Sequence, residues 1–365
     1  MERIKVLHIG LSHNVGGIET VVHSWLQHKP SELQFDFINN GDLPLAFEKE
    51  ILHAGGEIFK VVPRKRNPIK SYLQLKKIIE QGQYDYVHHH IMSFSWPEPC
   101  LMVNRLKGKT KMIMHAHTVI SDHLPVKYKI LDKIGRMRLH KKQYCRIACS
   151  RMAGESMFPA EMFYTVKNGI DFSRYSFSQK NRESIRAQLG LEKGDIVIGH
   201  VGRSCYEKNY PFLLQCFKRS SDVNERLKLL LIGDILQDNE IQKTIDMLHL
   251  RHKIVQTGLV ATVTPYYSAM DVFFLPSVVE GISLALLEAQ VSGLPCVVSE
   301  NVSLEAKICN RVEFVPIDDY KVAVEALNKA TEAVCIEDRD VRPDDSYSLK
   351  TTSKTMVDIY RKHMS

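Results

Sequence analysis

The sequence predicts an α/β protein built from two doubly wound domains, each with a parallel β-sheet between layers of helices. Three observations indicate this fold class. Short β-branched or apolar runs alternate with longer amphipathic segments, and the alternation restarts in the second half of the chain. The 365 residues suffice for about two domains of roughly 150 residues each. The contents of hydrophobic residues, 44%, and charged residues, 25%, are ordinary for globular proteins and exclude a disordered, fibrous or coiled-coil chain.

The first half of the chain contains seven apolar or β-branched runs that we expect to form strands. They are Ile4–Ile9, Phe35–Ile38, Ile58–Val61, Tyr86–His89, Lys111–His115, Cys145–Cys149 and Tyr164–Val166. Amphipathic segments between them predict helices at Ile18–Gln27, Ile69–Ile79 and Lys127–Lys142. This alternation predicts a parallel sheet, because parallel strands need a crossover connection between them.

The second half repeats the pattern after a polar stretch at residues 171–180. Strands are predicted at Ile196–Val201, Leu227–Ile232, Val272–Leu275 and Cys296–Val298, and helices at Asn181–Leu189, Pro211–Arg219, Glu240–Leu250 and Ser283–Ser292. An isolated amphipathic helix, Ser346–His363, follows an acidic loop. We therefore expect domains at residues 1–175 and 176–345, and a C-terminal helix at residues 346–365.

Charge and cysteine content indicate the compartment and the ligands. The chain has 49 Lys and Arg against 42 Asp and Glu, a mild basic excess that suits anionic small molecules or an acidic membrane surface and does not indicate nucleic acid. The eight cysteines form no C-x-x-C pair, which is typical of free thiols in a reducing cytosol. With neither a secretory leader nor an apolar run of 18 residues, the sequence predicts a soluble cytoplasmic protein, or one attached peripherally to the inner face of the plasma membrane.

The run from Leu275 to Ala289 predicts a strand that ends at Leu275, a turn, and then a helix that starts between Gly281 and Ser283. The backbone N–H groups at such a helix start, here those of Ile282, Ser283 and Leu284, can bind a diphosphate. Glu280 and Glu288 then lie about two turns apart on one side of the helix, separated by about 12 Å of rise. This spacing suits the two ends of one extended ligand with sugar hydroxyls. The alternative is that Glu280 caps the helix and Glu288 is solvated.

Two glycine turns follow predicted strands. Gly202, Arg203 and Lys208 follow the first strand of the second half, and two cations there can neutralise a diphosphate leaving group without a metal. The alternative is that Arg203 and Lys208 are simply two solvated cations of a loop. Gly16 and Gly17 follow the first strand of the chain and permit close approach to phosphate, although structural turns of this kind are commoner. The chain lacks a G-x-G-x-x-G run, which argues against a dinucleotide-dependent dehydrogenase.

Histidines gather at the ends of two predicted strands, at residues 88–90 and at His115 and His117. Neighbouring side chains of a strand point to opposite faces, so the histidines cannot all serve one site. They are buried strand-end residues, a polar donor or base, or, least favoured, metal ligands. Among them we favour His115 as a functional group, because it lies at the predicted carboxyl edge of the sheet.

A basic segment from Lys127 to Arg146 alternates cations with apolar residues. A basic amphipathic helix can lie on an anionic lipid surface, and the alternative is a solvated helix face. Asp338-Arg339-Asp340 has the letters of an Asp-x-Asp metal motif, and we predict that it lies on the surface of a late acidic loop.

Taken together, these residues resemble the glycosyltransferase family 4 enzymes, in their bacterial capsule and exopolysaccharide branch. The resemblance covers nearly the whole chain, and its most specific feature is the spacing of Glu280 and Glu288. The matching runs are Gly16-Gly17-Ile18-Glu19, Asn168-Gly169-Ile170-Asp171, Gly202-Arg203, Lys208-Asn209, Asp271 to Ser277, Glu280-Gly281, Glu288-Ala289-Gln290 and Gly293-Leu294-Pro295.

The resemblance implies the glycosyltransferase B fold, with two facing Rossmann-like domains and a C-terminal helix that crosses back to the first. It implies retaining transfer of a hexose or N-acetylhexosamine from a nucleotide diphosphate sugar, with uridine as the expected base, to a glycan or lipid-linked acceptor in cell-surface polysaccharide synthesis. No metal or other cofactor is expected.

The resemblance also implies a role for each site residue. Arg203 and Lys208 hold the diphosphate, assisted by Gly202, Gly281 and the amides of Ile282, Ser283 and Leu284. Glu288 binds the ribose and Glu280 the donor hexose. His115 or His117 approaches the reacting carbon, and Gly16 and Gly17 lie against the phosphates. Two alternatives are a nucleotide-sugar epimerase on the same fold and a non-catalytic partner subunit; the second would be expected to lack at least one of Arg203, Lys208, Glu280 and Glu288.

Overall fold

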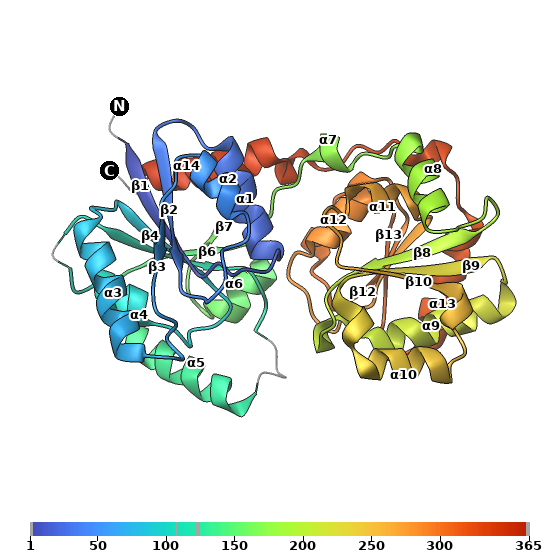
Figure 1. Cartoon of the computed structure of the whole chain (residues 1–365), viewed down its shortest axis with the longest axis horizontal. Coiled ribbons are helices and arrows are strands. Elements are labelled where there is room, and N and C mark those ends of the chain that lie inside the picture. The colour runs from blue at the N-terminus through green and yellow to red at the C-terminus, as the bar shows by residue number, and fades with distance from the viewer. Residues whose placement is uncertain (1–2, 107, 121–124, 363–365) are drawn as a thin grey trace. The chain divides into compact units, whose positions relative to one another are not determined.

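The computed structural model describes residues 3–106, 108–120 and 125–362, and the chain divides into two compact units (Figure 1). Unit 1 comprises Met1–Gly169 together with Ser346–Ser365, and unit 2 comprises Ile170–Asp345. The division falls after Gly169 rather than after residue 175, because the Asp171 side chain caps a short helix, α7 (Phe172–Tyr175), that contacts helices of unit 2. His363 of the expected C-terminal helix lies outside the described residues.

Unit 1 contains a seven-stranded, all-parallel sheet in the order β3-β2-β1-β4-β5-β6-β7. Its strands are β1 (Ile4–Ile9), β2 (Leu33–Asn39), β3 (Ile58–Lys60), β4 (Tyr86–Ile91), β5 (Lys111–Ala116), β6 (Cys145–Ala148) and β7 (Tyr164–Thr165). Its helices are α1 (Gly17–His28), α2 (Glu48–His53), α3 (Pro68–Gln81), α4 (Glu98–Val103), α5 (Val126–Leu139), α6 (Arg151–Met157) and α14 (Leu349–Lys362).

Unit 2 has a six-stranded parallel sheet in the order β10-β9-β8-β11-β12-β13. Its strands are β8 (Ile196–Val201), β9 (Leu227–Ile232), β10 (Ile254–Gly258), β11 (Val272–Leu275), β12 (Cys296–Ser299) and β13 (Val312–Val315). Besides α7 its helices are α8 (Gln179–Gln188), α9 (Tyr210–Val223), α10 (Asn239–Met247), α11 (Thr264–Ala269), α12 (Leu284–Val291) and α13 (Tyr320–Glu332). Both sheets are doubly wound, as the sequence predicts, and their direction of winding reverses between β1 and β4 and between β8 and β11.

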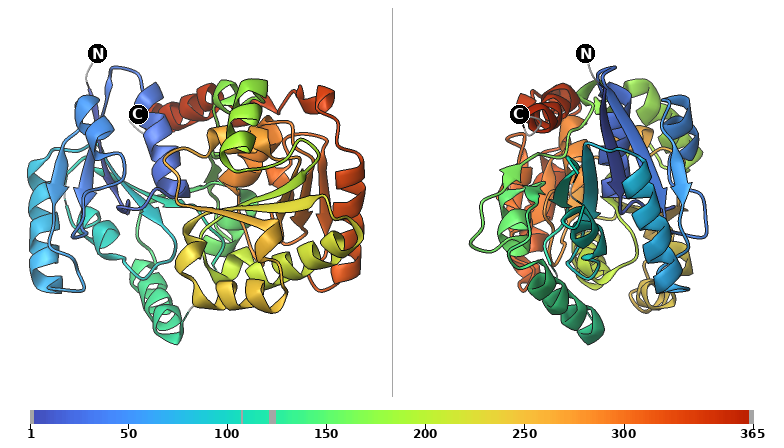
Figure 2. Two further views of the ribbon diagram at one scale, coloured as in Figure 1. Left: turned by 45° about the vertical axis from the view of Figure 1, so that its right-hand side comes forward. Right: turned by 90° about the vertical axis from the view of Figure 1, so that its left-hand side faces the viewer.

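The C-terminal helix α14 completes unit 1. It lies beside α1 in Figures 1 and 2, where α1 is blue and α14 is red. The phenol of Tyr86 donates to the backbone oxygen of Tyr360 over 2.5 Å, and the phenol oxygen of Tyr360 lies 2.7 Å from Nδ1 of His88. Both tyrosines are fully buried, so α14 closes the core of unit 1 over the amino-terminal half of its sheet's middle strand.

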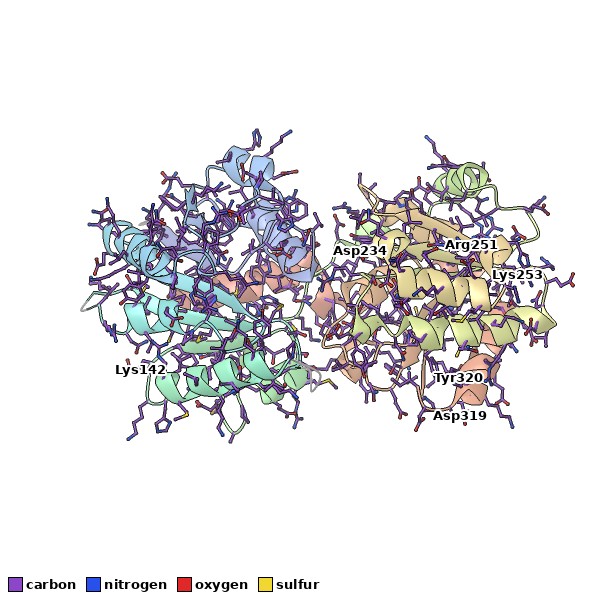
Figure 3. All side chains as sticks on the ribbon, turned by 60° about the horizontal axis from the view of Figure 1, so that its bottom comes forward. Lys142, Asp234, Arg251, Lys253, Asp319 and Tyr320 are labelled. Carbon is purple, nitrogen blue, oxygen red and sulfur yellow. The ribbon has the colours of Figure 1, made fainter. Side chains whose placement is uncertain are left out.

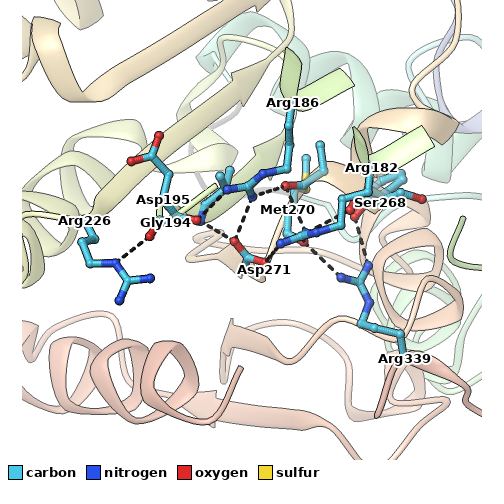
Figure 4. Close-up of polar contacts among 12 residues, drawn as sticks. Arg182, Arg186, Gly194, Asp195, Arg226, Ser268, Met270, Asp271 and Arg339 are labelled. Carbon is cyan, nitrogen blue, oxygen red and sulfur yellow. Dashed lines mark hydrogen bonds and ion pairs between the residues drawn. The ribbon is translucent and has the colours of Figure 1, made fainter. Parts of the chain in front are cut away.

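Three buried arginines of unit 2 gather near one carboxylate (Figure 4). Asp271, just before β11, accepts from Arg182 over 2.6 Å, from Arg186 over 3.2 Å and from the N–H of Val197 over 2.8 Å. Arg339 donates to the backbone oxygen of Met270 over 3.0 Å. Because guanidinium donors left unpaired in the interior are costly, these contacts fasten α8 and the segment before α14 to the sheet of unit 2.

The surface position predicted for the Asp338-Arg339-Asp340 run is correct for the two carboxylates and wrong for Arg339. Asp338 and Asp340 are exposed, whereas Arg339 is 5% exposed. Burial lowers the pKa of Arg339 to about 9, and its donors are directed at backbone carbonyls. The run is therefore an anchor for the chain rather than a metal-binding motif.

Candidate active site

The candidate active site of unit 2 lies where the winding direction of its sheet reverses. The loop after β8 carries Lys208, and the loop after β11 carries Glu280. These two strands are hydrogen-bonded neighbours, and ligands of doubly wound sheets bind beyond the carboxyl ends of such strands. The loops are also joined through the backbone, since the N–H of Val278 donates to the oxygen of Glu207 over 2.8 Å.

Lys208 and Glu280 form an ion pair at this edge. Lys208 Nζ lies 2.5 Å from Glu280 Oε1, and the two side chains are 15% and 18% exposed. Ser277 Oγ also donates to Glu280 Oε1, over 3.4 Å. A partly buried pair is screened less than a surface pair, so its attraction keeps the lysine side chain directed at this edge of the sheet.

Gly202 makes room for the stem of Lys208. A Cβ atom on Gly202 would lie 3.1 Å from Cδ and Cε of Lys208 and 2.9 Å from Nε2 of His200. His200 is fully buried, and burial, aided by the charge of Lys208, lowers its pKa to about 3. Its Nδ1 lies 2.9 Å from the oxygen of Phe274, which can only accept, so Nδ1 is the protonated nitrogen. A neutral ring therefore supports the lysine stem.

Arg203 is exposed at the same loop. The loop is held by the turn that follows β9. The N–H of Ser204 donates to Asp234, labelled in Figure 3, over 2.7 Å, and the Ser204 hydroxyl contacts Asp238. Asp238 also caps α10 through the N–H groups of its first turn. The backbone under Arg203 is thus fixed while its side chain reaches solvent.

The helix after β11 begins later than the sequence predicts. Ser283 is its N-cap, and α12 starts at Leu284. Glu280 lies in the preceding turn, where it pairs as an isolated bridge with Val302. The prediction that Glu280 and Glu288 share one helical face is therefore wrong, because Glu280 has no helical register.

The later start of α12 also changes which backbone N–H groups lie at its positive end. Of the three amides assigned to the diphosphate, Leu284 lies in the first turn of α12, whereas Ile282 and Ser283 lie before it. Gly281, Ile282 and Ser283 are buried. The positive end of the helix is thus presented by the amides of Leu284 and the two residues after it.

Glu288 is buried within α12 rather than solvated, with 7% of its surface exposed. The phenol of Tyr267 donates to Glu288 Oε2 over 2.6 Å. Burial raises the pKa of Glu288 to about 7, against the opposing effect of hydrogen bonds from Tyr267 and Tyr175. The carboxyl group thus exchanges its proton near neutral pH while held in one orientation.

In unit 1 the glycine turn after β1 leads directly into α1. Gly16 is the N-cap and Gly17 the first helical residue. Glu19 has a structural role that was not predicted from the sequence: its Oε1 accepts from the N–H of Ser12 over 2.8 Å and from the Ser12 hydroxyl over 2.9 Å. A Cβ on Gly16 would lie 2.8 Å from Glu19 Oε2, so the glycine gives the carboxylate room. The signal for this role was the position of Glu19, third in the helix.

The histidines of unit 1 form a buried cluster on one face of the sheet: His8 of β1, His88 and His90 of β4, His115 of β5, and His117. His89 points to the other face, against Trp96. The expectation that His115 lies at the edge of the sheet is wrong. β5 continues to Ala116, His115 is fully buried, and the partly exposed residue at the edge is His117.

Two sets of three histidines could meet the chemical needs of a transition metal. Ring nitrogens of His8, His88 and His90 lie within 4.8 Å of one another, as do those of His90, His115 and His117. Bonds of 2.0–2.1 Å from zinc to nitrogen place tetrahedral ligand atoms about 3.3 Å apart. The separations of 3.0 Å from His8 to His90 and of 2.8 Å from His90 to His117 instead suit a shared proton. We therefore interpret the cluster as hydrogen-bonded imidazoles.

The basic segment of unit 1 is shorter than predicted and carries an apolar stripe. Helix α5 ends at Leu139, and Arg146 lies in β6, paired with Glu161. Val126, Ile130, Ile134 and Met137 of α5 are exposed, by 46–71%. At 100° per residue these four positions fall within one narrow face of the helix. An apolar face of this kind, rather than basic charge alone, distinguishes α5 from an ordinary solvated helix.

Membrane-spanning helices are absent from the described part of the chain, where no helix combines sufficient length with sufficient apolar character.

Comparison with known proteins defines the class of the chain. Residues 181–339, which lie within unit 2, match the family described as Glycosyl transferases group 1. EpsF of Bacillus subtilis (strain 168), which carries the name of a glycosyltransferase, is 29% identical over 308 residues that cover 82% of this chain and 80% of EpsF. An Escherichia coli relative, UDP-Gal:alpha-D-GlcNAc-diphosphoundecaprenol alpha-1,3-galactosyltransferase, is 25% identical over 354 residues, which are 90% of this chain and 88% of that enzyme.

A solved structure supports the fold assignment. Anabaena HepE in complex with UDP and glucose superimposes with a TM-score of 0.75 and 16% identity, covering 99% of this chain and 98% of HepE. The fold is therefore that of the glycosyltransferase B class. Together with the family match within unit 2 and the named relatives, the comparisons identify the chain as a glycosyltransferase.

Proposed function

We propose that this glycosyltransferase moves a hexose or N-acetylhexosamine from a UDP-sugar to a glycan or lipid-linked acceptor, with retention at the anomeric carbon. The observation that carries the proposal is the Lys208–Glu280 pair at the reversal point of the group 1 domain. The names of the relatives support the donor and the acceptor, since one is named for transfer from UDP-Gal to a diphosphoundecaprenol-linked sugar and another structure holds UDP and glucose.

The donor diphosphate is held by two cations and by the start of α12. Lys208 and Arg203 neutralise the negative charge that grows on the departing diphosphate, and the Leu284 amide adds the helix dipole. Glu280 exchanges part of its bond to Lys208 for a hydroxyl of the hexose. Glu288 accepts from ribose hydroxyls. In this proposal no metal is required, because the protein's own cations supply the stabilising charge.

His117, rather than His115, is the histidine we assign to the donor sugar. His115 is closed off within β5, whereas His117 follows the strand and is partly exposed at its carboxyl end. Gly16 and Gly17 follow β1 at the same edge of the unit 1 sheet, since parallel strands end together.

The test is transfer by Lys208→Ala compared with Lys218→Ala. Lys218 lies on α9 in an exposed pair with Asp222 and serves as a matched control. We expect about a 10²- to 10³-fold loss of kcat for Lys208→Ala and wild-type turnover for the control. Turnover within tenfold of the wild type in both variants would contradict the proposed role.

The assay uses a panel of UDP-sugars with a diphospholipid-linked sugar acceptor, and NMR records the anomeric configuration of the product. Inversion would refute the retaining assignment. An incubation without acceptor distinguishes the epimerase alternative, since an epimerase converts the donor alone.

We also propose that α5 attaches the enzyme to the cytoplasmic face of an anionic membrane. The stripe of Val126, Ile130, Ile134 and Met137 supplies the apolar contact. Lys133 within the helix and Lys142 just after it (labelled in Figure 3) supply positive charge.

The test is co-sedimentation with vesicles. We expect binding to vesicles with anionic lipid, weaker binding to zwitterionic vesicles, and loss of binding in the double variant Ile130→Ser and Ile134→Ser. The matched control is Ile69→Ser with Leu73→Ser, because these residues are similarly exposed on α3. Equal effects of the two double variants would refute a specific role of α5.

A further inference from the structure

Three histidines of unit 1 form a continuous hydrogen-bonded chain that runs from the interior to the edge of the sheet. Nδ1 of His8 lies 3.0 Å from Nε2 of His90, and Nδ1 of His90 lies 2.8 Å from Nε2 of His117. The rings of His8 and His90 are nearly parallel, at 8°. These distances fit N–H···N hydrogen bonds in which one ring donates and the other accepts.

All three rings are neutral. Burial lowers the pKa of His8 and of His117 to about 3, and that of His90 well below its ordinary value. A neutral imidazole carries one N–H and one bare nitrogen. The chain therefore contains three protons, of which its two hydrogen bonds use two. The third proton must sit on an outer nitrogen, either Nε2 of His8 or Nδ1 of His117.

The two outer nitrogens have different surroundings. Neither has a hydrogen-bond partner among residues 3–106, 108–120 and 125–362. His8 is fully buried and packs against Phe35, with ring centres 4.5 Å apart, and against Phe37, at 5.2 Å. His117 follows β5 and is partly exposed as a residue, although its Nδ1 atom is covered.

An unpaired N–H costs more in the interior than a bare acceptor nitrogen. The cost is smaller in a residue at the surface, where a small displacement lets a ligand or solvent reach the N–H. The third proton therefore belongs at the His117 end. The direction of the chain follows: His8 donates to His90, and His90 donates to His117.

We infer that His8 and His90 are positioning residues that hold His117 in its Nδ1–H tautomer, so that this N–H donates to an oxygen of the bound nucleotide sugar. The acceptor is a hydroxyl or phosphate oxygen, because both offer lone pairs to a neutral donor. The inference rests on the proposed function in its last step alone, the identity of the ligand. The tautomer itself is a property of unit 1.

This state differs from that of an isolated ring. In water a neutral imidazole favours the Nε2–H form, so an Nδ1–H ring at His117 would reveal the donor His90 behind it. Because each ring is packed against the next, the proton is also held in a fixed direction. His117 is then a rigid donor rather than a general base.

The test is long-range ¹H–¹⁵N NMR of the full chain labelled in histidine, with the His117 signals assigned by their loss in His117→Gln. We expect a protonated Nδ1 and a bare Nε2 in the wild type. His90→Phe removes the donor, so His117 should revert to Nε2–H. His90→Asn places an amide N–H near the position of Nδ1 and should restore the Nδ1–H form. An Nε2–H wild type, or an unchanged tautomer in a folded His90→Phe, overturns the inference.

The matched control is His89→Phe, the same exchange of a buried histidine one residue away on the other face of β4. It should leave the tautomer of His117 and transfer unchanged. His90→Phe should lower kcat/KM about tenfold, the effect of losing one hydrogen bond, and His90→Asn should recover most of it. If the wild type transfers no sugar, the proposed function fails, and the NMR result still decides the direction of the chain.

Discussion

Replacing Asp271 by Asn should destabilise unit 2 strongly, because the carboxylate forms ion pairs with two buried guanidinium groups. Arg182 and Arg186 are 9% and 7% exposed and donate to it over 2.6 and 3.2 Å. Removing one partner of a buried ion pair costs about 3–5 kcal/mol, since the remaining charge stays buried. Both arginines also donate to backbone carbonyls, and the new amide keeps one acceptor, so we expect about 3 kcal/mol.

For a unit of this size, 1 kcal/mol shifts Tm by about 2–4 °C, which predicts a fall of about 6–12 °C. Calorimetry and urea unfolding followed by circular dichroism measure the two quantities. The control is Asp246→Asn, whose pair with Arg251 is exposed by 57% and 58% and should contribute little to stability. Equal shifts for Asp271→Asn and Asp246→Asn would refute the argument that burial makes this carboxylate indispensable.

Three further changes should alter stability in ways that urea titration can measure. Because the pKa of Glu288 is raised to about 7, the folded chain binds a proton more tightly than the unfolded chain, and it loses stability as pH rises from about 4.5 to 7. Glu288→Gln should abolish this loss, which is about 3 kcal/mol at pH 7. Parallel pH profiles of stability for the two proteins would contradict the assignment. Tyr360→Phe should lower the free energy of unfolding by about 1–3 kcal/mol, because Nδ1 of His88 loses its hydrogen-bond partner. An unchanged free energy of unfolding would show that the 2.7 Å contact contributes nothing to stability. Gly10→Ala should lower the free energy of unfolding by about 2 kcal/mol or more, because Gly10 has φ +105° and a Cβ would lie 2.3 Å from the backbone oxygen of His90. An unchanged free energy of unfolding would mean that the turn rearranges freely.

Strands that are buried on both faces were predictable from the sequence. Ile4–Ile9, Ile196–Val201, Leu227–Ile232 and Val272–Leu275 were each predicted with the bounds that the structure has. Parallel strands covered on both sides are continuous apolar runs, which is a strong local signal. Strands β10 and β13 were not predicted; they lie at the two edges of the unit 2 sheet and include partly exposed residues. Their pattern is weaker because one side of each has no neighbouring strand.

The errors in the predicted site arose where the bounds of strands and helices were predicted wrongly. His115 was placed at the edge because its strand was predicted to stop there, but pairing with β4 and β6 carries β5 on to Ala116. Glu280 is expected at the mouth of the next helix, on the same side as Glu288, whereas α12 begins at Leu284 and Glu280 lies in the turn before it. Both bounds depend on partners that lie far away in the chain.

The meeting of Lys208 and Glu280 depends in the same way on contacts that local spacing does not encode. They are 72 positions apart, and the topology of the sheet brings them together. The residue types of the site were recognisable in the sequence, and their contacts required the fold.

Unit 1 is formed by two parts of the chain that are separated by the whole of unit 2, and this has a consequence during biosynthesis. Its last helix, α14, is encoded after the whole of unit 2, and it supplies Tyr360, which contacts Tyr86 and His88 in the core of unit 1. While the ribosome is still translating unit 2, the nascent first unit therefore lacks this cover and leaves apolar and imidazole side chains open to water or chaperones. A premature stop before residue 349 would leave the first unit permanently in that incomplete state, even though every strand of both sheets had been made.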